Sequence, residues 1–321
     1  MIRAGIIGGG GYTAGELVRL LLNHPEVQIV FVHSNSQAGS PVAGGHSGLE
    51  GETDLIFIGG AAPVETIDVL FLCTPHGDSR KYLNENIIPA SLKIIDLSTD
   101  YRKKDETHDF VYGLPELNRE TISQSQHIAN PGCFATAIQL ALLPSAKEGR
   151  LGNEVHVHAL TGSTGAGAIP STTTHFSWRS DNISIYKPFT HQHLGEIRQT
   201  LGSLGWNGEL NFIPLRGDFT RGIFATVYFN TPLSLDEAHA LYSEYYRPHP
   251  FIVLAGSPPD LKQAVNTNKC ILHLHKNGEK LLITSIIDNL LKGAAGQSVQ
   301  NMNLLFGLDE RTGLRLKPSA F

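Results

Sequence analysis

One cysteine stands where the chain turns into a predicted helix. Cys133 follows Asn130-Pro131-Gly132, residues that favour a tight, non-helical turn, and it precedes the apolar, helix-favouring run 134–145. Unpaired N–H groups and the dipole at a helix start stabilise a thiolate, the nucleophilic form of cysteine. This context predicts a nucleophile at Cys133, with Asn130 beside it as a substrate contact. A small buried packing residue is the alternative, and the local sequence alone does not separate the two.

Two histidines and a glutamate form a second group with reactive side chains. His193 and Glu196 are three positions apart, so they share one face of the helix expected to open near residue 191. There Glu196 would orient His193 and raise its basicity as a general acid or base, and His191 is the second candidate for that role. A His-x-His pair also occurs in zinc sites, but no third ligand stands at metal spacing, so no metal is expected.

A glycine-rich turn at the start of the chain predicts a dinucleotide site. An apolar strand at 2–7 leads into Gly8–Gly11, a helical period covers 12–22, and a second strand follows at 27–32. Glycines in this setting let the backbone approach a pyrophosphate, which then rests on the helix N–H groups; a glycine turn without a ligand is the alternative. The predicted cofactor contacts in this turn are Gly8, Gly11, Tyr12, Thr13 and Ala14.

The next strand ends extend the cofactor site. No acidic residue follows the strand at 27–32, so a bond to the ribose 2′-hydroxyl of NAD is not indicated, and the hydroxyls of Ser34 and Ser36 suit the 2′-phosphate of NADP. Another apolar strand covers 68–73. Ligands of open α/β sheets bind at the carboxyl ends of strands, so we expect the residues directly after it to line the cofactor: Thr74, Pro75 and His76.

Residues suited to anions lie farther along the chain. Arg102 follows the expected strand 93–97, with a surface salt bridge as the alternative, and Arg216 and Arg221 flank a loop between two further strands. The small-residue run 161–168 offers N–H groups and hydroxyls that suit a phosphate, with a flexible surface loop as the alternative. From it we take Ser163 and Gly165, together with Arg102 and Arg216, as predicted substrate contacts.

Composition bounds the class of protein. The 321 residues suffice for two domains, and 17% charged with 41% hydrophobic residues describe a globular chain. A net charge of −5 without a basic block argues against nucleic-acid binding, and no apolar run reaches membrane-spanning length. Three widely spaced cysteines, Cys73, Cys133 and Cys270, favour no disulfide framework and indicate a reducing, cytoplasmic setting; Cys73 and Cys270 are expected to pack in the core.

The pattern of elements changes near residue 154. The alternation at 155–160 suits a half-exposed antiparallel sheet, with His156 and His158 facing solvent. A strand at 281–287 precedes a long helix expected over 290–306, whose alanines and glycines permit close packing on another helix or over a cofactor. Asn289 and Lys292, at the start of that helix, are further predicted cofactor contacts.

Taken together, these motifs resemble the N-acetyl-gamma-glutamyl-phosphate reductase family of arginine biosynthesis. The matching stretches run in family order over nearly the whole chain: GGGGYTAGEL, FLCTPHGDS, IIDLSTDYR, VYGLPELN, ANPGCFATA, TGSTGAGA, HQHLGEI, RGIFAT and DNLLKGAAGQSVQNMN. The resemblance implies an α/β fold with a doubly wound, Rossmann-type NADP-binding domain over 1–132 and about 290–321. It also implies an inserted α+β domain, 133–289, for catalysis and for contacts in a homodimer or homotetramer.

The resemblance implies a reaction as well. NADPH would reduce an N-acyl-glutamyl 5-phosphate to the semialdehyde with release of inorganic phosphate, through a thioacyl intermediate on Cys133, with His193 as acid and base. The chain departs from the usual family pattern at Asn35, Phe134-Ala135, Gln192 and Gly195. The alternatives are an N-succinyl in place of an N-acetyl substrate, an aspartate-semialdehyde dehydrogenase, and a non-catalytic NADP-binding protein.

Overall fold

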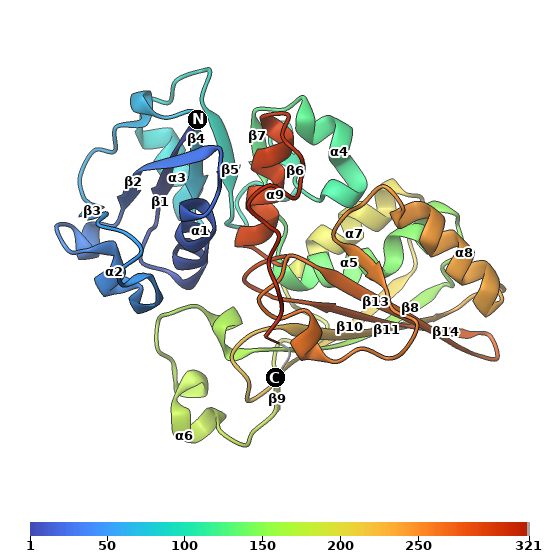
Figure 1. Ribbon diagram of the computed structural model, residues 1–321. Helices are drawn as coiled ribbons and strands as arrows, with labels where there is room; N and C mark the ends of the chain where they lie inside the picture. The colour runs from blue at the N-terminus through green and yellow to red at the C-terminus, as the bar shows by residue number, and fades with distance from the viewer. Residues whose placement is uncertain (320–321) are drawn as a thin grey trace. The chain divides into compact units, whose positions relative to one another are not determined.

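The computed structural model describes residues 1–319, which divide into two compact units (Figure 1). Unit 1 contains Met1–Pro131 and Ala294–Arg315, and unit 2 contains Gly132–Gly293 and residues 316–319. The boundary on the C-terminal side differs from the expected one, because residues 290–293 and the tail belong to unit 2. Within the described residues, no helix is long and apolar enough to cross a membrane.

Unit 1 is built on a seven-stranded sheet in which all neighbouring strands are parallel. The strand order is β3-β2-β1-β4-β5-β7-β6. The chain moves outward from β1 in one direction and resumes at β4 in the other, so the predicted doubly wound fold is confirmed, with its switch point between β1 and β4. The strands are β1 (Ile2–Ile7), β2 (Val27–His33), β3 (Phe57–Ile58), β4 (Val69–Leu72), β5 (Lys93–Asp96), β6 (Val111–Tyr112) and β7 (His127–Ala129).

Five α-helices accompany this sheet in the described part of unit 1. The helix predicted at 12–22 forms, with its apolar face against β2, and the C-terminal helix packs beside it and beside the fourth helix. The last helix therefore belongs to the same unit as the first strand, although nearly the whole chain separates them. The helices are α1 (Tyr12–Leu22), α2 (Val42–Gly45), α3 (Asp78–Glu85), α4 (Pro115–Ser123) and α9 (Ala295–Leu305).

Unit 2 contains a second seven-stranded sheet, ordered β12-β13-β14-β11-β8-β10-β9. The pairs β8–β10 and β12–β13 are parallel and the others antiparallel, so the expected antiparallel sheet is in fact mixed. A parallel pair arises because helix α7 carries the chain from one end of the sheet back to the other. The strands are β8 (Glu154–Thr161), β9 (Ser184–Ile185), β10 (Glu209–Arg216), β11 (Ile223–Asn230), β12 (Ile252–Leu254), β13 (Cys270–Asn277) and β14 (Lys280–Ile287).

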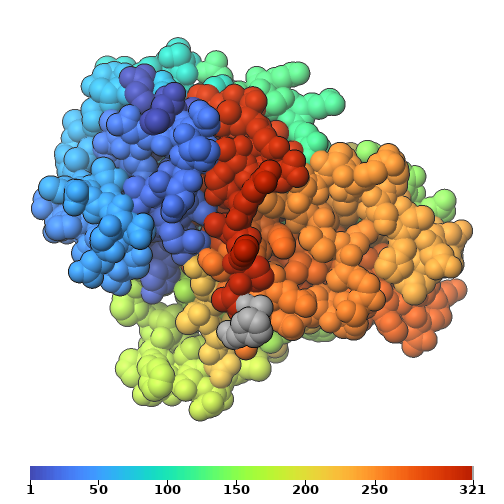
Figure 2. All heavy atoms as spheres, viewed as in Figure 1, coloured from blue at the N-terminus to red at the C-terminus, as the bar shows by residue number. Residues whose placement is uncertain are grey.

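Three long helices cover one face of this sheet (Figure 1). Helix α5 (Cys133–Lys147) is almost entirely buried and packs on β11 and β14, while α7 (His193–Ser203) and α8 (Leu235–Tyr246) flank it. Alternate residues of β8 point away from the helices, and His156 is half-buried and His158 exposed, as the alternation predicted. The segment 163–190, yellow-green in Figure 2 and containing α6 (Phe176–Arg179), carries the exposed apolar side chains of Ile169, Phe176, Ile183, Ile185 and Phe189.

One predicted element begins later than expected. The helix expected over 290–306 is α9, which starts at Ala295, and residues 289–294 form turns. The backbone N–H groups of Leu290 and Leu291 bond to the carboxylate of Asp288, and the N–H of Gly293 bonds to its carbonyl. These bonds curl the backbone around Asp288, and the helix starts five residues later than expected.

Candidate active site

Cys133 is the first residue of α5, as the sequence predicted. Gly132 is the N-cap with extended backbone angles, and its carbonyl accepts the first helical bond, from the N–H of Thr136 at 2.8 Å. The N–H groups of the first turn of α5 therefore have no carbonyl partner within the helix. The partly buried residue Cys133 belongs to this first turn. This arrangement favours a thiolate at Cys133.

His193 and Glu196 lie against the residue before the cysteine. The backbone N–H of Gly132 donates to Glu196 Oε2 at 3.0 Å, and Glu196 Oε1 lies 4.0 Å from His193 Nε2. A Cβ added to Gly132 would lie 2.3 Å from His193 Nε2, so the imidazole rests directly on the glycine. The structure thus brings Cys133, His193 and Glu196 into one cluster at the junction of α5 and α7.

His191 has a different environment from His193. Its side chain is 4% exposed, and its Nδ1 accepts the backbone N–H of His193 at 3.2 Å. Burial, aided by the positive charge of Lys187 and opposed by Glu196, lowers the pKa of His191 to about 4. His191 is therefore neutral at pH 7 and is a poor proton donor there, which favours His193 for proton transfer.

Aromatic rings surround the two imidazoles. Phe134 and Phe212 contact the His191 ring edge-on, each with centroids 5.5 Å apart, and Tyr186 contacts it at 5.7 Å. Burial, with the charge of Cys133 as a second cause, raises the pKa of Tyr186 well above its usual value, so its phenol stays protonated. Sequence reasoning missed Tyr186, because nothing in the polar segment before it marks a buried ring.

Arg216 stacks on this tyrosine. Its guanidinium carbon lies 4.7 Å from the centroid of the Tyr186 ring, and its buried Nε has no hydrogen-bond partner within residues 1–319. A buried guanidinium N–H without an acceptor is costly, and an anionic ligand would satisfy it. Arg216 therefore remains the predicted anion contact that the geometry favours.

The other two arginines are used within the protein. Arg221 pairs with the fully buried carboxylate of Asp288. Its role as an anchor for an anionic substrate stays a prediction. Arg102 is 6% exposed, which excludes a surface salt bridge, and it donates to the carbonyls of Leu97 and Asn130 at 2.9 and 2.8 Å. It supports the turn before the nucleophile, and contact with substrate stays a prediction.

Asn130 is also held by its own unit. It is 1% exposed, its Nδ2 donates to the carbonyl of Ala294 at 3.1 Å, and its Oδ1 accepts from Asn301 at the same distance. Its side chain thus ties the strand end before Cys133 to the start of α9. A contact with substrate, predicted from its position, would require exchange of one of these bonds.

The small-residue loop after β8 does not form the predicted nest of N–H groups. The N–H groups of Gly162, Ser163 and Thr164 donate to the carbonyls of residues 222, 219 and 220 at 3.0, 2.8 and 3.1 Å. This part of the loop is bonded to the β10–β11 connection, so these three N–H groups are not available to an anion. Ser163, which is half-buried, and Gly165, which is exposed, stay predicted substrate contacts.

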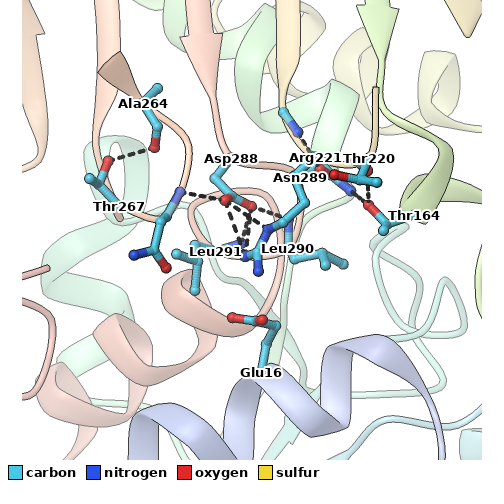
Figure 3. Close-up of polar contacts among 12 residues, drawn as sticks. Glu16, Thr164, Thr220, Arg221, Ala264, Thr267, Asp288, Asn289, Leu290 and Leu291 are labelled. Atoms are coloured by element: carbon cyan, nitrogen blue, oxygen red, sulfur yellow. Dashed lines mark hydrogen bonds and ion pairs between the residues drawn. The ribbon is translucent and has the colours of Figure 1, made fainter. Parts of the chain in front are cut away.

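The turn after β14 is stabilised by polar contacts within unit 2 (Figure 3). Asn289 Oδ1 accepts from the N–H of Gly222 at 2.7 Å, and its Nδ2 donates to Thr164 Oγ1 at 3.1 Å. Lys292 is fully buried, with its ammonium 5.9 Å from the ring of Phe251. Both side chains are thus buried inside unit 2. Their contacts with the cofactor stay predictions.

The glycine turn between β1 and α1 fits a pyrophosphate. Gly8 has φ +82° and lies so close to Cys73 that a Cβ would come within 2.5 Å of its carbonyl oxygen, so only glycine suits this position. Gly11 is the N-cap of α1, and a Cβ there would have no protein atom within 4 Å. The open space at the N-terminus of α1 is therefore a cradle that a side chain would fill and a phosphate fits.

The remaining predicted cofactor contacts differ in how exposed their side chains are. Tyr12 is 44% exposed, whereas the side chain of Ala14 is fully buried, and its cofactor contact stays a prediction. Ser34 is buried, with its Oγ 3.4 Å from that of the exposed Ser36. The other predicted contacts lie at accessible positions: Thr13 and Thr74 are half-buried, and Pro75 and His76 are exposed.

Sequence reasoning missed one support of the glycine turn. His46 Nε2 lies 2.7 Å from the carbonyl oxygen of Gly9, and its ring covers Gly15 so closely that a Cβ there would meet Nδ1 at 2.6 Å. His46 is the bend residue directly after α2, in a stretch without a recognisable motif, so no sequence signal marked it.

The other two cysteines have no nucleophile geometry. Burial, with Asp96 as a second cause, raises the pKa of Cys73 far above its usual value, and Cys270 is fully buried in β13. Cys270 thus packs in the core as expected, whereas Cys73 is only partly buried. Among residues 1–319 no group of three or more His, Cys, Asp or Glu side chains is arranged to hold a metal ion.

Comparison with known proteins identifies the family. Residues 3–125 match the model of the semialdehyde dehydrogenase NAD binding domain, and residues 133–289 match that of the semialdehyde dehydrogenase dimerisation domain. Aspartate-semialdehyde dehydrogenases from Vibrio cholerae and, with NADP, from Candida albicans share the fold with a TM-score of 0.73 each. They are 16% and 15% identical and align over 96% and 95% of this chain and 98% of theirs.

Much closer relatives exist in sequence. The N-acetyl-gamma-glutamyl-phosphate reductases of Parabacteroides distasonis and Christiangramia forsetii are 60% and 55% identical, each over the full length of both chains. This identity extends over both units. The chain belongs to the N-acetyl-gamma-glutamyl-phosphate reductase family.

Proposed function

We propose that this protein catalyses the NADPH-dependent reduction of N-acetyl-glutamyl 5-phosphate to N-acetyl-glutamate 5-semialdehyde, a step of arginine biosynthesis. The observation that carries the proposal is the cluster at the start of α5, where Cys133 follows a glycine against which His193 and Glu196 lie. A thiolate at a helix start, a neighbouring base and a carboxylate that orients the base are the parts that acyl transfer requires. The full-length relatives named above support the choice of substrate.

The reacting groups of the first half-reaction belong to unit 2. His193 accepts the thiol proton, and the Cys133 sulfur forms a bond to the acyl carbon of the mixed anhydride. N–H groups at the start of α5 stabilise the oxyanion, and the C–O bond to phosphate breaks, leaving a thioester on Cys133 and inorganic phosphate. Arg216, stacked on Tyr186, supplies the positive charge for an anionic part of the substrate.

The second half-reaction returns the cysteine to its thiolate form. The bound cofactor would supply the hydride for conversion of the thioester to the aldehyde. The N–H groups at the start of α5 hold the carbonyl oxygen during this step as in the first, and the departing Cys133 thiolate is stabilised again by the helix start. Glu196, 4.0 Å from His193 Nε2, favours the protonated imidazole while the thiolate is present.

The units then have separate roles. Unit 1 binds NADP, with Gly8, Gly11, Ser34 and Ser36 at the pyrophosphate and the 2′-phosphate, and unit 2 carries the catalytic groups. The match to a dimerisation domain supports a homodimer or homotetramer formed through unit 2. The three widely spaced cysteines support a cytoplasmic location.

The reverse reaction provides the test. Purified wild type, Cys133→Ala and, as a matched control, Cys270→Ala are offered phosphate, NADP or NAD, and one of three aldehydes: N-acetyl-glutamate semialdehyde, N-succinyl-glutamate semialdehyde or aspartate semialdehyde. We expect phosphate-dependent NADPH formation with the N-acetyl compound, retained in Cys270→Ala and abolished in Cys133→Ala. Turnover of only the N-succinyl compound or only aspartate semialdehyde would replace the proposed substrate, and NADP binding without any turnover would refute an enzymatic role.

A further inference from the structure

Asp288 binds three separate segments of unit 2 through one buried carboxylate (Figure 3). Oδ1 accepts the N–H groups of Leu290 and Leu291 at 2.8 and 3.2 Å, and Oδ2 accepts that of Asn266 at 2.8 Å. Arg221 adds Nε to Oδ2 at 3.1 Å and Nη2 to Oδ1 at 3.2 Å. The carboxylate thus joins the β10–β11 connection, the loop before β13 and the turn after β14.

The buried Asp288 carboxylate is stabilised by the hydrogen-bond donors around it. A fully buried charge is tolerated only where such partners replace water, and here one guanidinium and three N–H groups do so. Because three of these donors are backbone groups, the charge of Asp288 determines main-chain geometry. In the turn itself, the Asp288 carbonyl also accepts the N–H of Gly293 at 2.9 Å, so both ends of the turn are fixed to this residue.

The fixed turn lies on the nucleophile. A Cβ added to Gly293 would come within 2.7 Å of Cys133 Cβ and 2.6 Å of the Asn289 carbonyl oxygen. The Gly293 backbone is therefore in close contact with one side of Cys133, and glycine is required there for proximity, not for a left-handed backbone. We call this backbone contact of Gly293 the wall beside Cys133. Displacement of the turn would remove it.

We propose that Asp288, with Arg221, is a positioning residue for Cys133: it holds the 289–293 turn against the nucleophile and so restricts the thiol to its reactive orientation. The role in turnover rests on the function proposed above, whereas the contact with Cys133 does not. Asp288 touches no reacting atom in this scheme. Its effect passes through the turn and Gly293.

Kinetics of Asp288→Asn, Gly293→Ala and the double variant test the pathway. The asparagine amide would present N–H groups to donors, which loosens the turn while preserving side-chain volume. We expect kcat to fall about 10- to 100-fold in each single variant at a temperature well below Tm, with KM near the wild-type value, because the thiol is misplaced and the substrate contacts are intact. The double variant should lose no more than the worse single variant, since both act through one contact.

Glu310→Gln is the matched control, because Glu310 is another buried carboxylate paired with an arginine, Arg119, but belongs to unit 1. It should lower Tm and leave kcat unchanged. An Asp288→Asn enzyme with wild-type kcat, or a double variant whose losses multiply, would overturn the proposal.

Alkylation gives a readout that does not depend on turnover. Iodoacetamide is reacted with wild type and Asp288→Asn across pH, and modification of Cys133 and Cys270 is followed by peptide mass spectrometry. Loss of the wall should raise the limiting rate at Cys133 several-fold and leave the fully buried Cys270, in the same unit, unmodified. Equal labelling of both cysteines would show general loosening, and an unchanged rate at Cys133 would show no positioning; either result refutes the proposal. A wild type without turnover would refute the proposed reaction while this arm still decides the role of Asp288.

Discussion

The carboxylate of Glu196 accepts the backbone N–H of Gly132 over 3.0 Å, although 64 positions separate the two residues. The bond joins the first turn of α7 to the N-cap of α5, and both residues are buried. The same carboxylate lies 4.0 Å from His193 Nε2 through its other oxygen. One side chain thus fixes the backbone that precedes the nucleophile and provides the negative charge beside the base.

Glu196→Gln separates these two roles. Glutamine keeps an oxygen that accepts the Gly132 N–H, but it removes the charge that favours a protonated His193. We expect kcat to fall about 10-fold or more with little change in Tm, because the proton acceptor is weakened while the helix junction is preserved. Glu154→Gln is the control, since Glu154 pairs with His156 at 3.3 Å on the exposed face of β8. Equal kcat values for Glu196→Gln and Glu154→Gln would show that the charge has no part in catalysis.

Gly132→Ala probes the contact between the nucleophile turn and the base. The added methyl would lie 2.3 Å from His193 Nε2, so the imidazole must move away from Gly132. We expect a loss of kcat of about 100-fold from misplacement of His193, accompanied by a lower Tm. Steady-state kinetics and thermal unfolding of the same preparations provide the measurement.

Gly256→Ala is the matched control for that substitution. Gly256 also lies in unit 2, and a Cβ there meets no protein atom within 4 Å. It should leave kcat unchanged. A Gly132→Ala enzyme as active as Gly256→Ala would show that the His193 position next to Gly132 is not the one used in catalysis.

The parts of this architecture that follow local rules were predictable from sequence. The helix start at Cys133 follows from Asn-Pro-Gly before an apolar run, and the parallel sheet follows from apolar strands alternating with helices. His193 and Glu196 share a face because they are three positions apart on a helix. Each of these predictions depended only on residues close in sequence.

The parts that depend on distant partners were not predictable. The helix after β14 starts late because the Asp288 carboxylate accepts two backbone N–H groups. Helix propensity alone does not predict these bonds. The loop at 162–164 looked like a nest of N–H groups, but carbonyls of residues 219–222 already accept its bonds. The pairing of Arg221 with Asp288 was not predictable either, because the two residues are 67 positions apart.

The neutral, buried His191 predicts a pH dependence of stability. The pKa of His191 is about 4 in the folded protein and about 6.5 in the unfolded chain, so between these values the unfolded state binds a proton that the folded state excludes. Stability is therefore full above pH 6.5 and falls as the pH is lowered towards 4, by about 3 kcal/mol from this residue.

His191→Asn should make that decline shallower, because asparagine cannot be protonated yet can still accept the N–H of His193. Urea unfolding of both proteins at pH 7 and pH 5 measures the difference in free energy. If the two proteins lost the same stability between these pH values, His191 would not be the group that titrates.

Gly11 provides the sharpest test of the cofactor cradle. Most glycines of this turn serve the fold: a Cβ at Gly8 would meet the Cys73 carbonyl, and one at Gly9 would meet Val32 Cγ1 at 2.5 Å. A Cβ at Gly11 meets no protein atom, so packing gives no reason for glycine at this N-cap. We therefore expect Gly11→Ala to keep the wild-type Tm and to weaken NADP binding about 10-fold or more, because its methyl projects where the pyrophosphate approaches the α1 N–H groups.

Gly44→Ala serves as the matched control for this variant, since it is a glycine of unit 1 whose Cβ likewise meets nothing within 4 Å. Titration calorimetry with NADP should give the wild-type affinity for Gly44→Ala and a weaker one for Gly11→Ala. Equal, undiminished affinities in both variants would move the pyrophosphate away from the N-terminus of α1. A loss of Tm in Gly11→Ala alone would mean that the glycine serves the helix start and not the ligand.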